Sequence, residues 1–253
     1  MARISLDEIS TKAPGNFDKA ETKANLASLG KELTDLQNLL YAENKHALLI
    51  VLQGMDASGK DGVIRDVFSF MNPQGIMVSS FKVPTEKELS HDFLWRIHKH
   101  TPARRMIQVF NRSHYEDIIV TRVHKLIDDE TAHKRMRAIN DFERLLREHN
   151  NTHILKFYLH VSRDEQAQRL KERRVDPTKM WKFSDRDHRE ASKWEEYIQV
   201  YEDCFEHCND PEWIIVPSDQ NWYKEFVIAK AIRDKMAGLD MQYPGIGEVN
   251  KKS

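Results

Sequence analysis

The 253-residue chain has little cysteine and no apolar run that approaches the length of a membrane span. Its two cysteines, Cys204 and Cys208, lie four residues apart in a predicted helix. No second pair with zinc-ligand spacing accompanies them, so we interpret them as ordinary reduced thiols. The first residues, M-A-R-I-S-L-D-E, lack the apolar core of a signal peptide. These absences favour a cytoplasmic protein without a membrane partner.

The chain also lacks an excess of either sign of charge. Lys and Arg total 39 and Asp and Glu total 40, which leaves a net charge of −1. Global charge therefore gives no reason to expect a nucleic-acid partner, and any anion site must be a local concentration of basic residues. A chain of this length can form one α/β domain, and we predict a single domain over residues 1–253.

Residues 52–62 read L-Q-G-M-D-A-S-G-K-D-G and have the spacing of a phosphate-binding loop. They follow the apolar run 48–52, which predicts a strand buried on both faces at the centre of a parallel sheet. A helical pattern follows over 62–71. In such a loop the glycines let backbone N–H groups converge on phosphate oxygens, and the following helix N-terminus adds positive charge. Lys60 would neutralise phosphoryl oxygens.

Two carboxylates in this loop depart from the usual pattern. Asp61 stands where Ser or Thr would bind magnesium, and Asp56 lies inside the loop itself. Negative charge beside phosphates is unfavourable unless it holds a cation, and Mg²⁺ prefers carboxylate oxygens and water. We therefore predict that Asp56 and Asp61 are metal ligands.

Strands and helices are predicted to alternate along the chain. Strands are expected at 48–52, 76–81, 106–110, 154–160 and 213–216, and helices at 21–41, 62–71, 86–98, within 114–149, at 162–174, 194–205 and 223–236. Capping boxes are predicted at Ser113–Glu116 and Ser162–Glu165. A leucine stripe on the first helix could form a dimer seam, but packing on the domain's own sheet is favoured.

Alternation of this kind predicts a five-stranded parallel sheet covered by helices on both faces, the three-layer α/β/α architecture of P-loop kinases. Ligands of such sheets bind beyond the carboxyl ends of the strands. Loop 53–61, Lys82 after the second strand, and Asn111-Arg112 after the third should share this rim. Arg112 is placed there to clamp an anionic acceptor.

A second concentration of charge lies between the fourth strand and the next helix. Residues 169–189 hold four acids (Glu172, Asp176, Asp185, Asp187) and eight basic residues, a local excess of +4 (Arg169, Lys171, Arg173, Arg174, Lys179, Lys182, Arg186, Arg189). A solvated surface segment could have this composition. Its position on the rim of the phosphate loop favours a lid over about 172–192, with a mobile loop at 175–190.

Several stretches resemble the polyphosphate kinase 2 family. They are G-M-D-A-S-G-K-D-G at 54–62, N-P-Q-G at 72–75, S-F-K-V-P at 80–84, E-L-S-H-D at 88–92, F-N-R-S-H-Y-E-D at 110–117 and R-V-D-P-T-K-M-W-K-F-S at 174–184. The resemblance implies Mg²⁺-dependent, reversible phosphoryl transfer from inorganic polyphosphate to nucleotides, with Mn²⁺ as a substitute ion. The N-R-S-H-Y-E form resembles the subgroup that accepts AMP and ADP, with GMP and GDP as further acceptors. A homodimer or homotetramer is also implied.

Motif and resemblance together define the expected site. The expected catalytic residues are Asp56, Lys60, Arg112 and Arg174. The expected phosphate and polyphosphate contacts are Gly54, Ala57, Ser58, Gly59, Lys60, Asp61, Arg65, Lys82, Lys179 and Lys182. The expected acceptor residues are Asn111, Arg112, Tyr115, Glu116 and Asp117. Residues 1–44 are expected to form an N-terminal extension.

Two other functions share part of this sequence pattern. An ATP-dependent kinase of a small metabolite or nucleoside would share the core, but it would favour Ser or Thr after Lys60. A nucleotide-binding switch protein would carry N-K-x-D and a D-x-x-G after the third strand, and neither is placed here.

Overall fold

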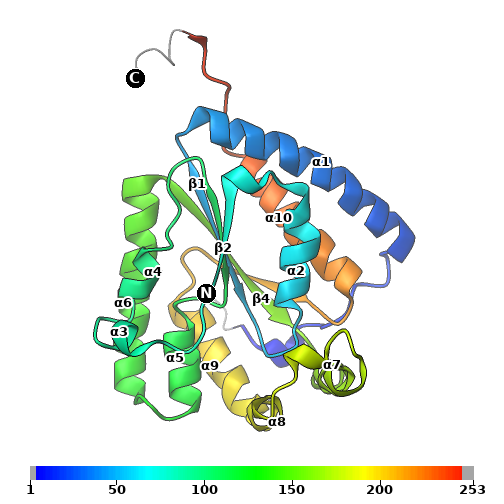
Figure 1. Ribbon diagram of the computed structural model, residues 1–253, viewed down its shortest axis with the longest axis vertical. Coiled ribbons are helices and arrows are strands. Elements are labelled where there is room, and N and C mark those ends of the chain that lie inside the picture. Colours follow the sequence, from blue (N-terminus) through cyan, green and yellow to red (C-terminus); the bar gives the residue numbers. More distant parts are fainter. Residues whose placement is uncertain (1–3, 247–253) are drawn as a thin grey trace.

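The computed structural model describes residues 4–246, so the ends of the predicted 1–253 domain lie outside the described part. Its centre is a five-stranded sheet in the order β2-β3-β1-β4-β5, with every neighbouring pair parallel (Figure 1). The strands are β1 (Ala47–Gln53), β2 (Ile76–Ser80), β3 (Ile107–Asn111), β4 (Thr152–His160) and β5 (Trp213–Pro217). The predicted parallel sheet with the 48–52 strand at its centre is confirmed.

Helices cover both faces of the sheet (Figure 1). One face carries α1 (Lys19–Glu43), α2 (Lys60–Val67) and α10 (Asn221–Ala237), and the other carries α4 (Trp95–His98), α5 (Glu116–Val123), α6 (Asp129–Asn150) and α9 (Trp194–His207). Strand β1 has an unbroken apolar sequence because both of its faces are buried. Leu48 and Ile50 pack on one face of the sheet, and Leu49 and Val51 pack on the other. The predicted three-layer P-loop kinase-like architecture is confirmed.

The N-terminal region packs on this domain. The leucine stripe of α1 joins the core beside α10, with Leu33 and Leu40 fully buried, as favoured over a dimer seam. Residues 4–18 are mostly irregular, and they cross the molecule near the carboxyl ends of the strands. The backbone N–H of Leu6 donates to Glu202, and Thr11 donates to Asp219 over 2.8 Å.

Some predicted helix boundaries are wrong. The helix expected at 86–98 is two short ones, α3 (Glu86–Leu89) and α4. The capping box at Ser113–Glu116 does not form, because α5 begins only at Glu116 and that carboxylate pairs with an arginine. At the other predicted box, Ser162 caps α7 (Arg163–Val175) by accepting from the Glu165 N–H over 3.2 Å. Glu165 itself turns to Arg169.

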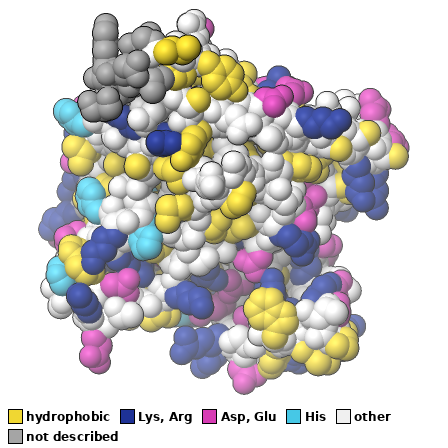
Figure 2. All heavy atoms as spheres, turned by 45° about the horizontal axis from the view of Figure 1, so that its top comes forward, with side chains coloured by type: hydrophobic (Ala, Val, Ile, Leu, Met, Phe, Trp, Pro, Cys, Tyr) yellow, Lys and Arg dark blue, Asp and Glu magenta, His cyan; other side chains and the backbone are white. Residues whose placement is uncertain are grey.

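The segment after α7, where a loop was predicted over 175–190, contains short regular elements. It contains a 3₁₀ turn at Met180–Lys182 and helix α8 (Arg186–Ala191) before α9 begins. Figure 1 places α7 and α8 together at the end of the molecule that holds the loop after β1. Figure 2 shows Lys and Arg side chains interspersed with Asp and Glu over one face, in keeping with the net charge of −1.

Both cysteines are free thiols, as predicted, and both are buried. Burial raises the pKa of Cys208 to about 12, so the thiol stays protonated at neutral pH. Within residues 4–246, none of the helices combines the length and apolarity needed to cross a bilayer.

Candidate active site

The phosphate loop leaves the end of β1 and leads directly into α2. Two of its glycines have positive φ, 147° at Gly54 and 99° at Gly59. A Cβ at Gly54 would lie 2.9 Å from the carbonyl oxygen of Leu159, so the loop backbone is pressed against β4. At Gly59 a Cβ would meet the ammonium of Lys224. Only glycine fits both the conformation and the space.

Lys60 is buried inside this loop. Its Nζ donates to the carbonyl oxygens of Gly54 over 2.7 Å and Met55 over 3.1 Å. Burial, together with the positive charge of the neighbouring Arg112, lowers the pKa of Lys60 from its ordinary value to about 8. The ammonium therefore remains charged at neutral pH, with its proton held less firmly than that of a surface lysine.

Arg112 joins the end of β3 to the phosphate loop. Its guanidinium lies 2.5 Å from Asp56 Oδ1 and 3.0 Å from Glu116 Oε2. Glu116 is the main cause that raises the pKa of Arg112, against the opposing effect of burial. A narrow pocket opens beside this cluster, with Tyr197 and Tyr201 of α9 in its wall. The pocket thus combines fixed charges of both signs with aromatic surface.

Asp61 is held from both sides. Asn111 donates to its Oδ1 over 3.0 Å, and Lys182 donates to its Oδ2 over 2.7 Å. Partial burial opposes ionisation, but these two hydrogen bonds outweigh it and lower the pKa of Asp61. Asn111 therefore acts as a donor to the loop carboxylate.

The donor set fits a hard divalent cation. Asp56 lies in the loop and Asp61 in the first turn of α2, and each carboxylate is paired with a cationic side chain. Carboxylate oxygens with room for water are what Mg²⁺ prefers. Metal binding would require each carboxylate to share or exchange its present cationic partner.

The basic residues of the predicted lid are only partly brought to the loop. Lys182 reaches Asp61, as described. Lys179 pairs instead with Glu172 over 2.7 Å, within the lid itself. Arg174 is exposed and lies over the ring of Phe183, with 5.1 Å between the guanidinium carbon and the ring centroid. Arg174 and Lys179 are thus near the site and not in contact with the phosphate loop.

Two of the expected acceptor residues have buried side chains. The side chain of Tyr115 is fully buried, and its hydroxyl donates to Glu143 over 3.0 Å. Asp117 is buried as well and accepts from Arg96 over 3.0 Å. Helix α5 begins at Glu116, two residues later than the predicted capping box implies, and neither Tyr115 nor Asp117 lines the pocket beside Arg112.

Two expected polyphosphate contacts are surface side chains. Arg65 pairs with its neighbour Asp66 over 2.7 Å and is 77% exposed. Lys82 is exposed at the end of β2, and its carbonyl oxygen accepts from Arg96 over 2.8 Å. Neither side chain contacts the phosphate loop in this structure.

Sequence reasoning missed the residues that hold the loop from behind. Arg169 donates to the carbonyl oxygens of Ala57 over 3.0 Å and Ser58 over 3.1 Å, and Lys224 donates to the latter over 3.3 Å. Gln166 donates to the carbonyl oxygen of Asp56 over 2.9 Å. These side chains fix the loop through its carbonyl oxygens and use none of its N–H groups, which are the groups that bind an anion. The only sequence signal was that Arg169 belongs to the basic stretch.

Comparisons with known proteins agree with this geometry. The family model for polyphosphate kinase 2 matches residues 16–244. The AMP/ADP-polyphosphate phosphotransferase of Meiothermus ruber is 46% identical over 87% of this chain and 82% of its own. The ADP-polyphosphate phosphotransferase of Rhodopseudomonas palustris is 41% identical over 99% of this chain and 91% of its own. A crystal structure of polyphosphate kinase 2 from Arthrobacter aurescens TC1 superimposes with a TM-score of 0.91, at 39% identity over 96% of this chain and 88% of that one.

Proposed function

The chain belongs to the polyphosphate kinase 2 family, and on this premise we propose that it transfers phosphoryl groups from inorganic polyphosphate to AMP and ADP. The observation that carries the proposal is the ion pair between Asp56 and Arg112, 2.5 Å long. It joins the loop that would hold the donor phosphates to the strand end that would hold the acceptor. Phosphoryl transfer needs these two anions side by side.

The reaction is a displacement at phosphorus. A terminal phosphate oxygen of AMP or ADP attacks the last phosphorus of the polyphosphate chain and forms a new P–O bond. The bridging P–O bond breaks, and its electron pair leaves with the shortened chain. AMP becomes ADP and ADP becomes ATP, and in reverse ATP extends polyphosphate. Relatives from other bacteria are named GDP- and NDP-polyphosphate phosphotransferases, which supports GDP as a further acceptor, and we propose GMP beside it.

Side chains of this site would divide the work. Lys60 and the loop N–H groups would neutralise charge on the transferred phosphoryl group, while Arg112 and Glu116 would orient the acceptor. Mg²⁺, or Mn²⁺ in its place, would be held by Asp56 and Asp61 and would offset charge on the phosphate oxygens. Asn111 as an amide repels an additional acceptor phosphate less than an aspartate would, which suits the use of both AMP and ADP.

Binding of the donor would rest on a track of cations. Polyphosphate has no base or sugar to recognise, so affinity must come from repeated charge contacts. We propose that the track comprises two cations outside the lid, Lys82 after β2 and Arg65 on α2. In the lid at about 172–192 it comprises Arg174, Lys179 and Lys182. The contact of Lys182 with the loop supports this lid, and inward movement of Arg174 would complete it.

The proposal is tested by supplying the protein with polyphosphate, Mg²⁺ and either AMP or ADP, and measuring ATP. Production of ATP from both acceptors is expected. If ATP instead phosphorylates a small metabolite or nucleoside while polyphosphate is inert, the protein is an ATP-dependent P-loop kinase. The single 1–253 domain, its 1–44 extension, the cytoplasmic location and the dimer or tetramer stay predictions.

A further inference from the structure

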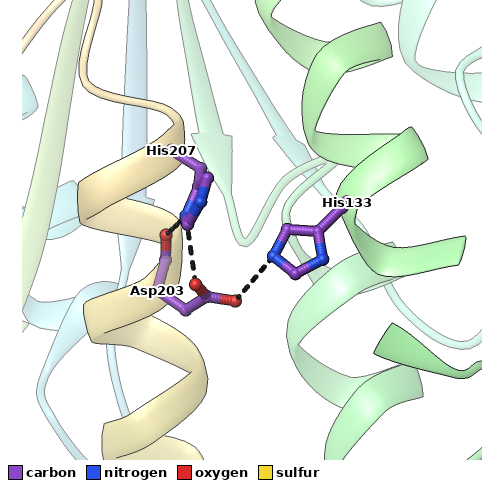
Figure 3. Close-up of side chains that lie close together, drawn as sticks. All are labelled: His133, Asp203 and His207. Atoms are coloured by element: carbon purple, nitrogen blue, oxygen red, sulfur yellow. Dashed lines mark hydrogen bonds and ion pairs between the residues drawn. The ribbon is translucent and has the colours of Figure 1, made fainter. Parts of the chain in front are cut away.

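Three metal-ligating side chains meet away from the phosphate loop. Figure 3 shows the carboxylate of Asp203 between two imidazoles, with His207 on the same helix α9 and His133 facing it from α6. Asp203 Oδ1 lies 3.0 Å from Nδ1 of His207, and Oδ2 lies 3.8 Å from Nε2 of His133. One ligand atom from each residue falls within 4.8 Å of the others. We propose that this cluster binds a late first-row divalent transition metal, with Zn²⁺ as its representative.

The sequence spacing and the packing both favour a preformed site. Asp203 and His207 are four residues apart, so they lie on one face of α9. The third ligand comes from another helix, and Asn140 of α6 holds the two helices together by donating to the carbonyl oxygen of His207 over 2.8 Å. Binding would therefore need little rearrangement of the backbone.

The chemistry of the donors selects the metal. Two imidazole nitrogens and one carboxylate suit Zn²⁺ and its neighbours in the first row, whereas Mg²⁺ prefers oxygen ligands. Three protein ligands leave a coordination position for water, and the side chains of His133 and His207 are 37% and 43% exposed. An ion can thus reach the cluster from solvent.

Asp203 also has the kind of outer partner that metal-ligating carboxylates have. Arg122 forms an ion pair with its Oδ2 and with Asp129, which fixes the orientation of the carboxylate. The cysteines next to two of the ligands, Cys204 and Cys208, are not part of the site, because both are fully buried in the core.

A bound ion would tie α6 to α9. Helix α9 also provides Tyr197 and Tyr201 to the wall of the pocket beside Arg112. The proposed ion is therefore a structural one, which stabilises the helix that borders the active site. A ligand that binds only the folded protein raises its melting temperature according to its concentration and affinity.

The test is a Zn²⁺ titration by calorimetry on the full chain after treatment with a chelator and dialysis. Excess Mg²⁺ is present to occupy the carboxylates of the phosphate loop. Wild-type protein should bind a single Zn²⁺ per chain, and His133→Gln and His207→Gln should each weaken the affinity by about tenfold or more. His149→Gln is the matched control, because His149 is an exposed histidine on the same helix α6.

Two further readouts keep the outcome unambiguous. Co²⁺ should give visible absorption bands with wild type that the two ligand variants lose, and Zn²⁺ should raise the melting temperature of wild type by about 5 °C or more near saturation. Circular dichroism establishes that each variant is folded. Absence of Zn²⁺ binding by wild type, or equal affinity in wild type and both ligand variants, would overturn the proposal and leave the cluster a set of ion pairs.

Discussion

Lys182, in the segment after α7, donates a hydrogen bond of 2.7 Å to Asp61 at the start of α2. The contact joins the lid to the phosphate loop across the mouth of the site. Both side chains are partly exposed, so the pair contributes little to stability, about 0–1 kcal/mol. We therefore expect Lys182 to act mainly by placing a positive charge beside the polyphosphate donor.

Lys182→Ala should therefore raise the KM for polyphosphate while leaving the melting temperature unchanged. Loss of one cation from the track should also make log KM less dependent on log salt concentration, by about 0.7 if polyphosphate resembles a single nucleic-acid strand. Lys230→Ala is the control, since Lys230 also pairs with an aspartate, but on α10. An unchanged KM and salt dependence in Lys182→Ala would remove Lys182 from the track.

Removal of the loop carboxylate should act on the chemical step. Asp56→Asn should lower kcat by about 10²-fold or more, because metal positioning and the partner of Arg112 are lost together. The Mg²⁺ dependence of the residual rate should shift to higher concentrations. Asp66→Asn, which changes a carboxylate paired with Arg65 on α2, should leave both quantities near wild type. Near-normal turnover of Asp56→Asn at low Mg²⁺ would contradict its assignment as a metal ligand.

The lowered pKa of Lys60 predicts a pH dependence. The cationic form is the active one, and its pKa in the free protein is about 8. As pH rises through this value the lysine loses its proton, so kcat/KM should fall above about pH 8 and approach a tenfold loss per pH unit. Below that pH, this group should cause no decline.

A second buried lysine provides the control for this profile. Burial, with a further contribution from Arg169, lowers the pKa of Lys224 to about 8 as well. Lys224→Met should keep the alkaline decline if Lys60 causes it. A flat profile up to pH 10, or a decline that disappears in Lys224→Met, would show that Lys60 is not the titrating group.

The buried position of Tyr115 is also open to test. Its hydroxyl donates to Glu143 and accepts from Lys156 over 3.1 Å, within a network that has no exposed side chain. Tyr115→Phe should lower the free energy of unfolding by about 1–2 kcal/mol and leave the KM values for AMP and ADP within about twofold of wild type. A raised KM for AMP or ADP at unchanged stability would indicate that Tyr115 contacts the acceptor.

The features that could be predicted from the sequence are those that depend on local patterns of residues. Residues 48–52 are apolar at every position because both faces of β1 are buried, and the G-x-x-x-x-G-K spacing follows from the geometry of a loop between strand and helix. The end of β3 could be placed on the same rim, since carboxyl ends of parallel strands share one edge. The position of Arg112, directly after β3, is predicted by this rule.

The rest depends on contacts between residues far apart in the sequence. Nothing near Asp117 indicates that it faces Arg96, and nothing near Tyr115 indicates a partner at Glu143. Arg169 reaches the phosphate loop from more than 100 residues away. The local sequence around such side chains does not reveal their partners. Those partners are determined by how the helices and strands pack in the folded protein.

The identity of the phosphoryl donor tests the account most directly. Initial rates of ATP formation from ADP are measured with polyphosphates of several lengths, beside rates with ATP as donor to a non-nucleotide acceptor, each at two salt concentrations. We predict rapid transfer from polyphosphate that weakens steeply with salt, and no transfer from ATP to the other acceptor. Inert polyphosphate together with efficient donation by ATP would contradict the account.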